Sequence, residues 1–128
     1  MKPIAFSLFF FISSFCYSQY LYDGSGRQVA RFDENYIYNA SGHQIGRIDV
    51  DMIYDGSGHQ IGRINGEYYY DGSGHQIGRV DGNYLYNGSG KQIGRLDGDY
   101  LYDGSGHQIG RADGLRRKQV MIYFYYFY

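Results

Sequence analysis

Residues 84–99 read YLYNGSGKQIGRLDGD, and close copies of these sixteen residues precede and follow this stretch. Six copies fill residues 20–115 without an insertion, so that equivalent residues are sixteen positions apart. The arginines show this spacing without a slip, at Arg31, Arg47, Arg63, Arg79, Arg95 and Arg111. A fixed period is typical of repeat proteins, in which each copy folds into one small unit and neighbouring units share a core.

Each copy has room for two short strands separated by two glycine-containing breaks. One strand is aromatic, as in residues 84–86, and the other covers residues 92–96. The pair Asp81-Gly82 indicates a tight hairpin, and we expect a type I′ turn in which both central residues take positive φ. The longer break at residues 87–90 is a loop in which the first side chain bonds its own backbone. Both breaks reverse the chain, which favours antiparallel hairpins over a parallel β-solenoid.

Alternation along the strands assigns their faces. In the aromatic strand the two tyrosines share one face and Leu85 lies on the other, while Ile93 and Arg95 are expected to share a face of the partner strand. A small residue recurs at the position of Gly94 in every copy, which predicts close packing there, by a tyrosine ring of the neighbouring strand. Closing the hairpins into a ring would remove the exposed edges of the sheet.

The composition fits one small all-β domain. The chain has 128 residues with 20 Gly, 17 Tyr and 20% aromatics, which is neither a disordered nor a helical composition. A net charge of −1 gives no electrostatic footprint for nucleic acid. One cysteine excludes both a disulfide framework and a cysteine-based zinc site.

Residues 1–18 have the features of a secretory signal peptide. Lys2 is followed by a largely apolar run at residues 4–15, and Ser18 is a suitable small residue before a cleavage site. The run is shorter than the roughly 20 residues of a membrane span. We therefore expect an exported protein, in the periplasm, at the cell surface or secreted, with residues 19–128 as a single domain. The alternative is a lipid anchor on Cys16, although Phe15 is large for the position before a lipidated cysteine.

The end of the chain, residues 116–128, departs from the repeat. From Val120 to Tyr128 every residue is apolar or aromatic. A strand that is apolar on both faces is normally buried on both faces, so we predict that this segment is an aromatic strand that forms the common core element, threaded through the ring of hairpins or packed against it. The alternative is a signal for outer-membrane insertion or a membrane-dipping segment behind a basic collar.

The ordered motifs resemble a known family. The recurring block G-[HK]-Q-I-G-R-[ILV]-[DN]-G, the leader that ends at Ser18-Gln19 and the run RRKQ at residues 116–119 resemble the five-fold β-flower proteins, small exported proteins of Bacteroides-like bacteria. The resemblance covers nearly the whole mature chain. It implies short hairpins arranged radially about an axis, and it implies no activity, cofactor or catalytic residue.

Six copies are compatible with five complete hairpins. Counted across the short turn, the complete units are residues 27–38, 43–54, 59–70, 75–86 and 91–102. A spare aromatic strand remains at residues 20–22 and a spare partner strand at residues 107–112. We predict that these two half-units meet to close the ring or frame the C-terminal strand.

Few residues carry the chemistry of an enzyme or a metal site. The histidines at equivalent positions, His43, His59, His75 and His107, are expected to lie roughly 9 to 10 Å apart, too far for one zinc ion. The Asp-Gly-Ser-Gly loops lack the oxygen ligands of a calcium loop. Every candidate nucleophile or base recurs in all copies, which leaves no place for an asymmetric active site. We expect no enzymatic activity, no metal and no cofactor.

The repeated arginines and tyrosines are the candidate binding residues. The simpler interpretation is a ladder in which each arginine pairs with Asp or Asn of a neighbouring turn. The alternative is a ring of guanidinium groups that binds a carboxylate or phosphate group. The candidate ligand-binding residues are Arg47, Arg63, Arg79, Arg95, Arg111, Tyr70, Tyr86 and Tyr102.

Two functions follow from this pattern. The first is a structural or protein-interaction module of the cell envelope, with an envelope protein as its partner. The second is a glycan-binding module that uses the repeated tyrosines. The position of the tyrosine rings distinguishes them, because rings packed on the Gly94-type positions belong to the core, whereas solvent-facing rings in register form a platform.

Overall fold

The computed structural model describes residues 19–128, so the expected signal peptide at residues 1–18 and Cys16 lie outside the described residues. Within residues 19–128, twelve short strands are followed by one helix, α2 (Arg117–Tyr126). The strands are β1 (Tyr20–Asp23), β2 (Gln28–Asp33), β3 (Tyr36–Asn39), β4 (Gln44–Asp49), β5 (Met52–Asp55), β6 (Gln60–Asn65), β7 (Tyr68–Asp71), β8 (Gln76–Asp81), β9 (Tyr84–Asn87), β10 (Gln92–Asp97), β11 (Tyr100–Asp103) and β12 (Gln108–Asp113).

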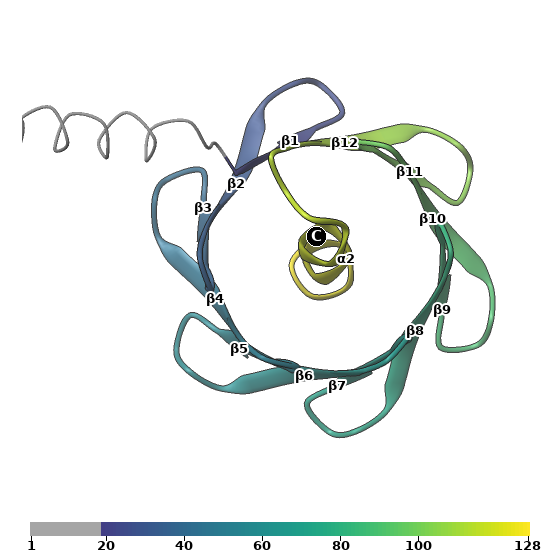
Figure 1. The fold of residues 1–128 in the computed structure, drawn as a ribbon, viewed down its shortest axis with the longest axis horizontal. Coiled ribbons are helices and arrows are strands. Elements are labelled where there is room, and N and C mark those ends of the chain that lie inside the picture. The colour runs from purple at the N-terminus through teal and green to yellow at the C-terminus, as the bar shows by residue number, and fades with distance from the viewer. Residues whose placement is uncertain (1–18) are drawn as a thin grey trace, which may run out of the picture.

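The strands form one closed antiparallel barrel in which chain neighbours are also neighbours in space (Figure 1). The two spare strands meet, because β1 pairs with β12 and Tyr20 lies opposite Asp113. The sixth hairpin is therefore assembled from the two ends of the repeat region. The all-β class, the antiparallel hairpins and the closure of the ring are confirmed.

The short turns reverse the chain in a different way from the one expected. The turn between β8 and β9 consists of Gly82 and Asn83, and of these only Gly82 has positive φ, at 62°. A type I′ turn needs positive φ at both central residues, whereas type II′ needs it at the first only. The type I′ prediction centred on Asp81-Gly82 is therefore wrong, and the pattern is that of type II′. Glu34 and Val50 occupy this strained position in two other turns, both with φ 56°.

The longer loops are stabilised by their first side chain, as predicted. In the loop after β5, Asp55 Oδ1 accepts hydrogen bonds from the backbone N–H groups of Ser57 and His59, both at 2.9 Å. Gly58 has φ 91° there, a conformation that suits only glycine. The loops flare outward like the blades of a pinwheel (Figure 1).

The two faces of the wall follow alternation except at a bulge. Leu85 and its equivalents Ile37, Ile53 and Leu101 are buried in the lumen. The register shifts between Gln92 and Gly94 in β10, and similar shifts occur where each loop-connected pair of strands begins. A bulge of this kind puts an extra residue on one strand. At the Ile93-type position, Val29, Ile45, Ile61, Ile77 and Ile109 pack against the core, so the expectation that this residue shares the outer face of the arginine is wrong for them.

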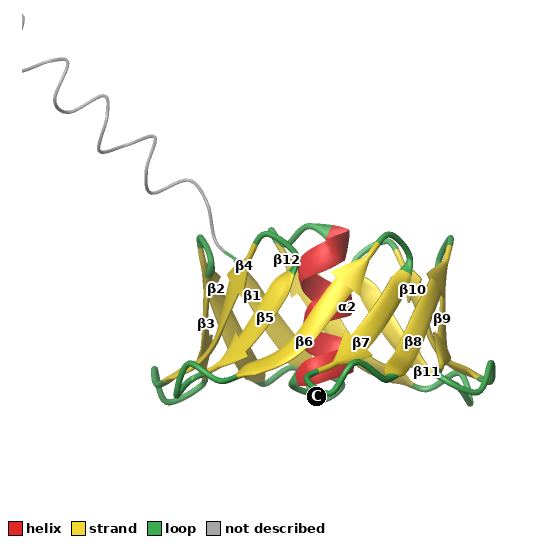
Figure 2. Ribbon diagram, turned by 90° about the horizontal axis from the view of Figure 1, so that it is seen from below, coloured by secondary structure: helices red, strands yellow, loops and turns green. Residues whose placement is uncertain are grey.

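The C-terminal segment is the core element, but it is a helix and not a strand. Helix α2 runs along the axis of the barrel (Figure 2). Val120, Met121 and Ile122 are each 2% exposed. The closed wall has no free edge with which an inner strand could pair, whereas a helix bonds its backbone groups to itself. Within residues 19–128 no helix is both long and apolar enough to cross a bilayer.

Rings of this C-terminal segment fill the space above the repeated glycines. A methyl group on Gly46, Gly62 or Gly78 would overlap the ring of Phe127, Tyr126 or Tyr125, respectively, and one on Gly94 would lie 3.0 Å from Phe124. The close packing is confirmed, but its source is wrong, because the rings come from the C-terminal segment and not from the neighbouring strand.

Candidate functional site

Arginine and tyrosine side chains form a continuous belt around the outside of the barrel. Each of the six arginines places its guanidinium carbon 4.2–4.5 Å from the centre of a tyrosine ring. The pairs are Arg31–Tyr38, Arg47–Tyr54, Arg63–Tyr70, Arg79–Tyr86, Arg95–Tyr102 and Arg111–Tyr22. At this distance the cation is attracted by the ring, by about 0.5–1 kcal/mol at exposed sites.

Strand pairing explains why these side chains meet. Arg79 lies directly opposite Tyr86 on β9 and opposite Tyr68 on β7. Side chains opposite each other in antiparallel strands lie on the same face and touch. The sixteen-residue repeat copies this arrangement around the barrel, and the closing pair Arg111–Tyr22 joins the two chain ends in the same manner.

Four of the arginines also form an ion pair with the aspartate two residues further along the same strand. The N···O distances are 3.9 Å for Arg31–Asp33, 3.9 Å for Arg47–Asp49, 3.7 Å for Arg79–Asp81 and 3.5 Å for Arg95–Asp97. Exposed ion pairs contribute little to stability. Their effect here is to place a negative charge beside each of these four guanidinium groups.

The structure brings the sequence-predicted residues together in pairs but not into one cluster. Three predicted pairs are stacked, Arg63–Tyr70, Arg79–Tyr86 and Arg95–Tyr102. The tyrosines beneath Arg47 and Arg111 are Tyr54 and Tyr22, which sequence reasoning missed. The available signal was the constant offset of seven residues from arginine to tyrosine. It fails only for Arg111 and Tyr22, at the seam where β12 pairs with β1. Because the belt lies on a convex wall, the guanidinium groups point outward in different directions.

A second set of tyrosines in the belt faces solvent. Tyr36, Tyr68, Tyr84 and Tyr100 are 41–45% exposed, and each starts the aromatic strand of its repeat. Equivalent positions two strands apart are roughly 9 to 10 Å apart. Sequence reasoning did not select these four, although their repeat position was visible. Their rings form a regular row and are not packed on the repeated glycines.

The histidines lie in the long loops at the other end from the short turns. His59 Nδ1 is 3.6 Å from Asp55 Oδ2, and His75 and His107 have the same arrangement. The hydrogen bond from the backbone of His59 lowers the pKa of Asp55. Among residues 19–128 no three His, Cys, Asp or Glu side chains gather in a way that could hold a metal ion.

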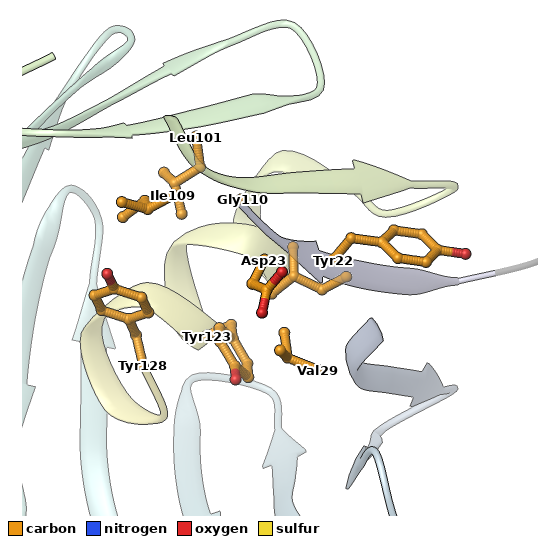
Figure 3. A pocket seen from close by; sticks show the side chains of 9 residues that line it. Tyr22, Asp23, Val29, Leu101, Ile109, Gly110, Tyr123 and Tyr128 are labelled. Atoms are coloured by element: carbon orange, nitrogen blue, oxygen red, sulfur yellow. The ribbon is translucent and has the colours of Figure 1, made fainter. Parts of the chain in front are cut away.

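A small cavity lies between the C-terminal segment and the seam of the barrel (Figure 3). Its volume is about 60 Å³, and its walls include Leu21, Val29, Gly110, Tyr123 and Tyr128. Sites for drug-sized ligands measure about 300–1,000 Å³. The cavity is a packing gap at the one repeated glycine, Gly110, that no ring of the C-terminal segment covers.

A larger cavity of about 350 Å³ lies at the short-turn end, beside the start of α2. Ala112 and Leu115 form part of its wall. Arg117 crosses it to donate a hydrogen bond to Asn83 Oδ1 at 2.6 Å and another to the carbonyl of Gly82. These bonds attach the helix to the turn between β8 and β9. The polar residues Arg117 and Asn83 in the lining of this cavity thus have a structural role.

Comparisons with known proteins agree with this geometry. A family model described as a 5-fold beta-flower protein matches residues 18–128. No curated protein matches the chain, and no solved structure does.

Proposed function

The chain belongs to the 5-fold beta-flower family, and we propose that it is an exported, non-enzymatic binding protein of the cell envelope. The observation that carries the proposal is the belt of arginines and tyrosines on the outer wall. Aromatic and arginine side chains are enriched where proteins bind partners. The lumen is filled by α2, so the outer wall is the surface on which a partner would bind.

The repeat itself supports a binding role over catalysis. The belt arginines recur in all six copies, as does the serine of the long loop, and histidine recurs in four copies. An active site instead needs different groups converging on one reacting atom. A repeated surface instead offers the same contact several times, which strengthens the binding of a repetitive or extended partner. We therefore assign the belt to recognition.

Export and partner binding are tested together in cells that produce the protein. Fractionation followed by N-terminal sequencing is expected to find a chain beginning at Gln19 in the envelope or the medium. A photo-reactive amino acid in place of Tyr84, on the belt, is expected to cross-link to an envelope partner, whereas the same probe in place of Ser89, in a long loop, is not. An unprocessed chain in the cytoplasm contradicts export, and equal cross-linking from both positions contradicts the belt as the binding surface.

A second candidate function, glycan binding, is favoured by the exposed row of tyrosines. Tyr68, Tyr84 and their equivalents face solvent in register, as a platform for the rings of a sugar chain requires. The absence of tryptophan weakens this candidate relative to a protein partner. A glycan array tests it. Binding is expected to be lost in the double variant Tyr68→Ser, Tyr84→Ser and retained in the loop variant His75→Ser, and an array without signal contradicts it.

A further inference from the structure

Arg63 differs from the other belt arginines in what stands two residues after it. Asp33, Asp49, Asp81 and Asp97 pair with their arginines, and Asp113 occupies the same position after Arg111. After Arg63 that position is Asn65. Within residues 19–128 no acidic side chain forms an ion pair with Arg63. Arg63 is therefore the one belt arginine of the described wall without an aspartate two residues further along.

The guanidinium group of Arg63 is nevertheless held in place. It lies 4.5 Å above the centre of the Tyr70 ring, like its equivalents in the other repeats. On its other side it faces Met52, where the equivalent arginines face a tyrosine. Stacking on one ring orients the planar group before any ligand arrives, and a methionine on the opposite flank is unbranched and adaptable. The result is a pre-oriented and partly exposed cation.

The residues around Arg63 provide contacts of two further kinds. Asn65 lies opposite Tyr68 in the hairpin, and Tyr68 is 42% exposed. The Asn65 amide both donates and accepts hydrogen bonds, which suits hydroxyl groups. The Tyr68 ring offers an apolar surface of the kind that lies against the carbon skeleton of a sugar.

We propose that Arg63, with Asn65 and Tyr68, binds an acidic sugar, whose carboxylate group bonds to the guanidinium group. The planar fork of arginine matches a carboxylate with two parallel hydrogen bonds. The inference rests on the glycan-binding candidate proposed above for the outer wall, and it identifies the charged group of that glycan. The proposal predicts one anion site and not a ring of six, because the other five repeats have an aspartate at the position of Asn65.

Glu67 is the acidic side chain of the same hairpin. It lies in the turn between β6 and β7, and its backbone carbonyl accepts a hydrogen bond from Val80 at 2.9 Å. Its carboxylate is exposed and repels an approaching anion, although water and salt screen this effect. Replacing it by the neutral Glu67→Gln is therefore expected to tighten binding.

Titration of the ¹⁵N-labelled protein with glucuronate tests the site by NMR. The Nε–Hε signal of Arg63 is expected to shift and saturate with a Kd of about 1–10 mM, a range typical of a single contact with a small ligand. The signal of Arg95 is the internal control, because Arg95 is stacked on Tyr102 in the same way, is paired with Asp97 and does not face Tyr68. Glucose at equal ionic strength is expected to cause no shift at Arg63. Equal shifts at all the belt arginines, or none at Arg63, overturn the proposal.

Two exchanges between repeats provide the matched variants. Asn65→Asp adds the aspartate that four other repeats already use, so the fold is preserved, and binding is expected to weaken by about tenfold or more. Asp97→Asn is expected to create a second site, with a new saturable shift at Arg95. Unchanged binding by Asn65→Asp overturns the proposal even if Arg63 responds to glucuronate.

Inorganic phosphate and a short glutamate peptide identify the source of the anion. Weaker binding of both than of glucuronate supports an acidic sugar, whereas tighter binding of either one overturns that assignment. Failure at Arg63 is separable from failure of the proposed function, because cross-linking from the belt position Tyr84 does not depend on Arg63.

Discussion

The wall of the barrel and the helix inside it are built in opposite ways. The wall repeats one sixteen-residue unit six times, whereas the C-terminal segment has no repeat. Four consecutive residues of that segment, at positions 124–127, each serve one of four repeated glycines, and the remaining glycine of this series, Gly110, is left beside a small cavity. The six repeats of the wall are alike, but the single helix cannot contact all of them in the same way. The small residue at this position makes room for a ring of the C-terminal segment in four of the repeats.

Removal of the helix is expected to have the largest effect. A chain that ends at Leu115 lacks Val120, Met121 and Ile122, and burial of each contributes about 1.5–3 kcal/mol. Together with the aromatic rings this exceeds a typical stability of about 5–15 kcal/mol, so the truncated chain should not fold. Circular dichroism and NMR measure the outcome. Removal of Tyr128 alone, which is 70% exposed, is the control, and a folded truncated monomer would mean that the wall closes without the helix.

Alkaline pH is expected to unfold the protein by ionising the buried tyrosines where the C-terminal segment contacts the wall. Burial raises the pKa of Tyr125 and Tyr126 above the usual value of 10, and it raises the pKa of Tyr69 to about 12. A raised pKa means that the neutral form is favoured in the folded state. The stability contribution of these rings is therefore complete below pH 10 and is lost as the pH rises through 12 and above.

Ultraviolet absorbance of tyrosinate, recorded together with circular dichroism, checks this expectation. Ionisation of the buried rings of Tyr69, Tyr125 and Tyr126 should coincide with unfolding. A single absorbance step near pH 10 with no loss of structure would show that the rings of the helix are open to water.

Two equivalent glycines of the wall, one covered by a ring of the C-terminal segment and one not, offer a matched test of how unevenly this segment fills the barrel. Gly78→Ala is expected to destabilise the protein by about 1–3 kcal/mol, because the new methyl group overlaps the Tyr125 ring, whose hydroxyl donates to the carbonyl of Tyr86 at 2.8 Å. Gly110→Ala occupies the same position of another repeat. Its nearest new contact is 3.3 Å from the carbonyl oxygen of Tyr22, so its cost should be under about 1 kcal/mol.

Urea denaturation of the two variants decides between these values. Ala30 already stands at this position in the first repeat, where it is fully buried, so the backbone of the wall accepts an alanine there. Equal losses in both variants would assign the need for glycine to the strand itself and not to the helix.

The repeat explains why the wall was predictable and the helix was not. Sixteen-residue spacing, alternation of Tyr84, Leu85 and Tyr86, and paired turns specify antiparallel hairpins, and closure follows because residues 20–23 and 108–113 are complementary halves. Residues 120–128 are apolar at every position, so periodicity cannot distinguish a buried strand from a buried helix. The closed wall decided this, and a closed wall is a property of the whole fold.

The binding residues were predictable by type but not by environment. The recurrence of arginine and tyrosine indicated the residues of the belt. Arg63 stands out only by comparison with the other repeats, in which an aspartate pairs with the arginine, as Asp81 does with Arg79. Likewise the bulge in β10 turns the face of neighbouring residues without any proline or unusual residue to mark it.

The smallest expected effect concerns a defect within the wall itself. Val50 takes a left-handed conformation with φ 56°, at the position where Gly66, Gly82 and Gly98 have φ 61–63°. This conformation is costly for a β-branched residue, and Val50 is 82% exposed, so its side chain gains little burial in return. Val50→Gly is therefore expected to stabilise the protein by about 1 kcal/mol, after the greater flexibility of glycine in the unfolded chain is included.

The reverse exchange in a regular turn completes this test. Gly82→Val is expected to lower the free energy of unfolding by a similar amount or more, since Arg117 also bonds to the carbonyl of Gly82 and the turn must stay in place. Glu34→Gly should stabilise less than Val50→Gly, because glutamate is not branched at Cβ. If Val50→Gly instead destabilises the protein, the turn between β4 and β5 is held by contacts of the valine side chain, and the repeats of the wall are less equivalent than their backbones indicate.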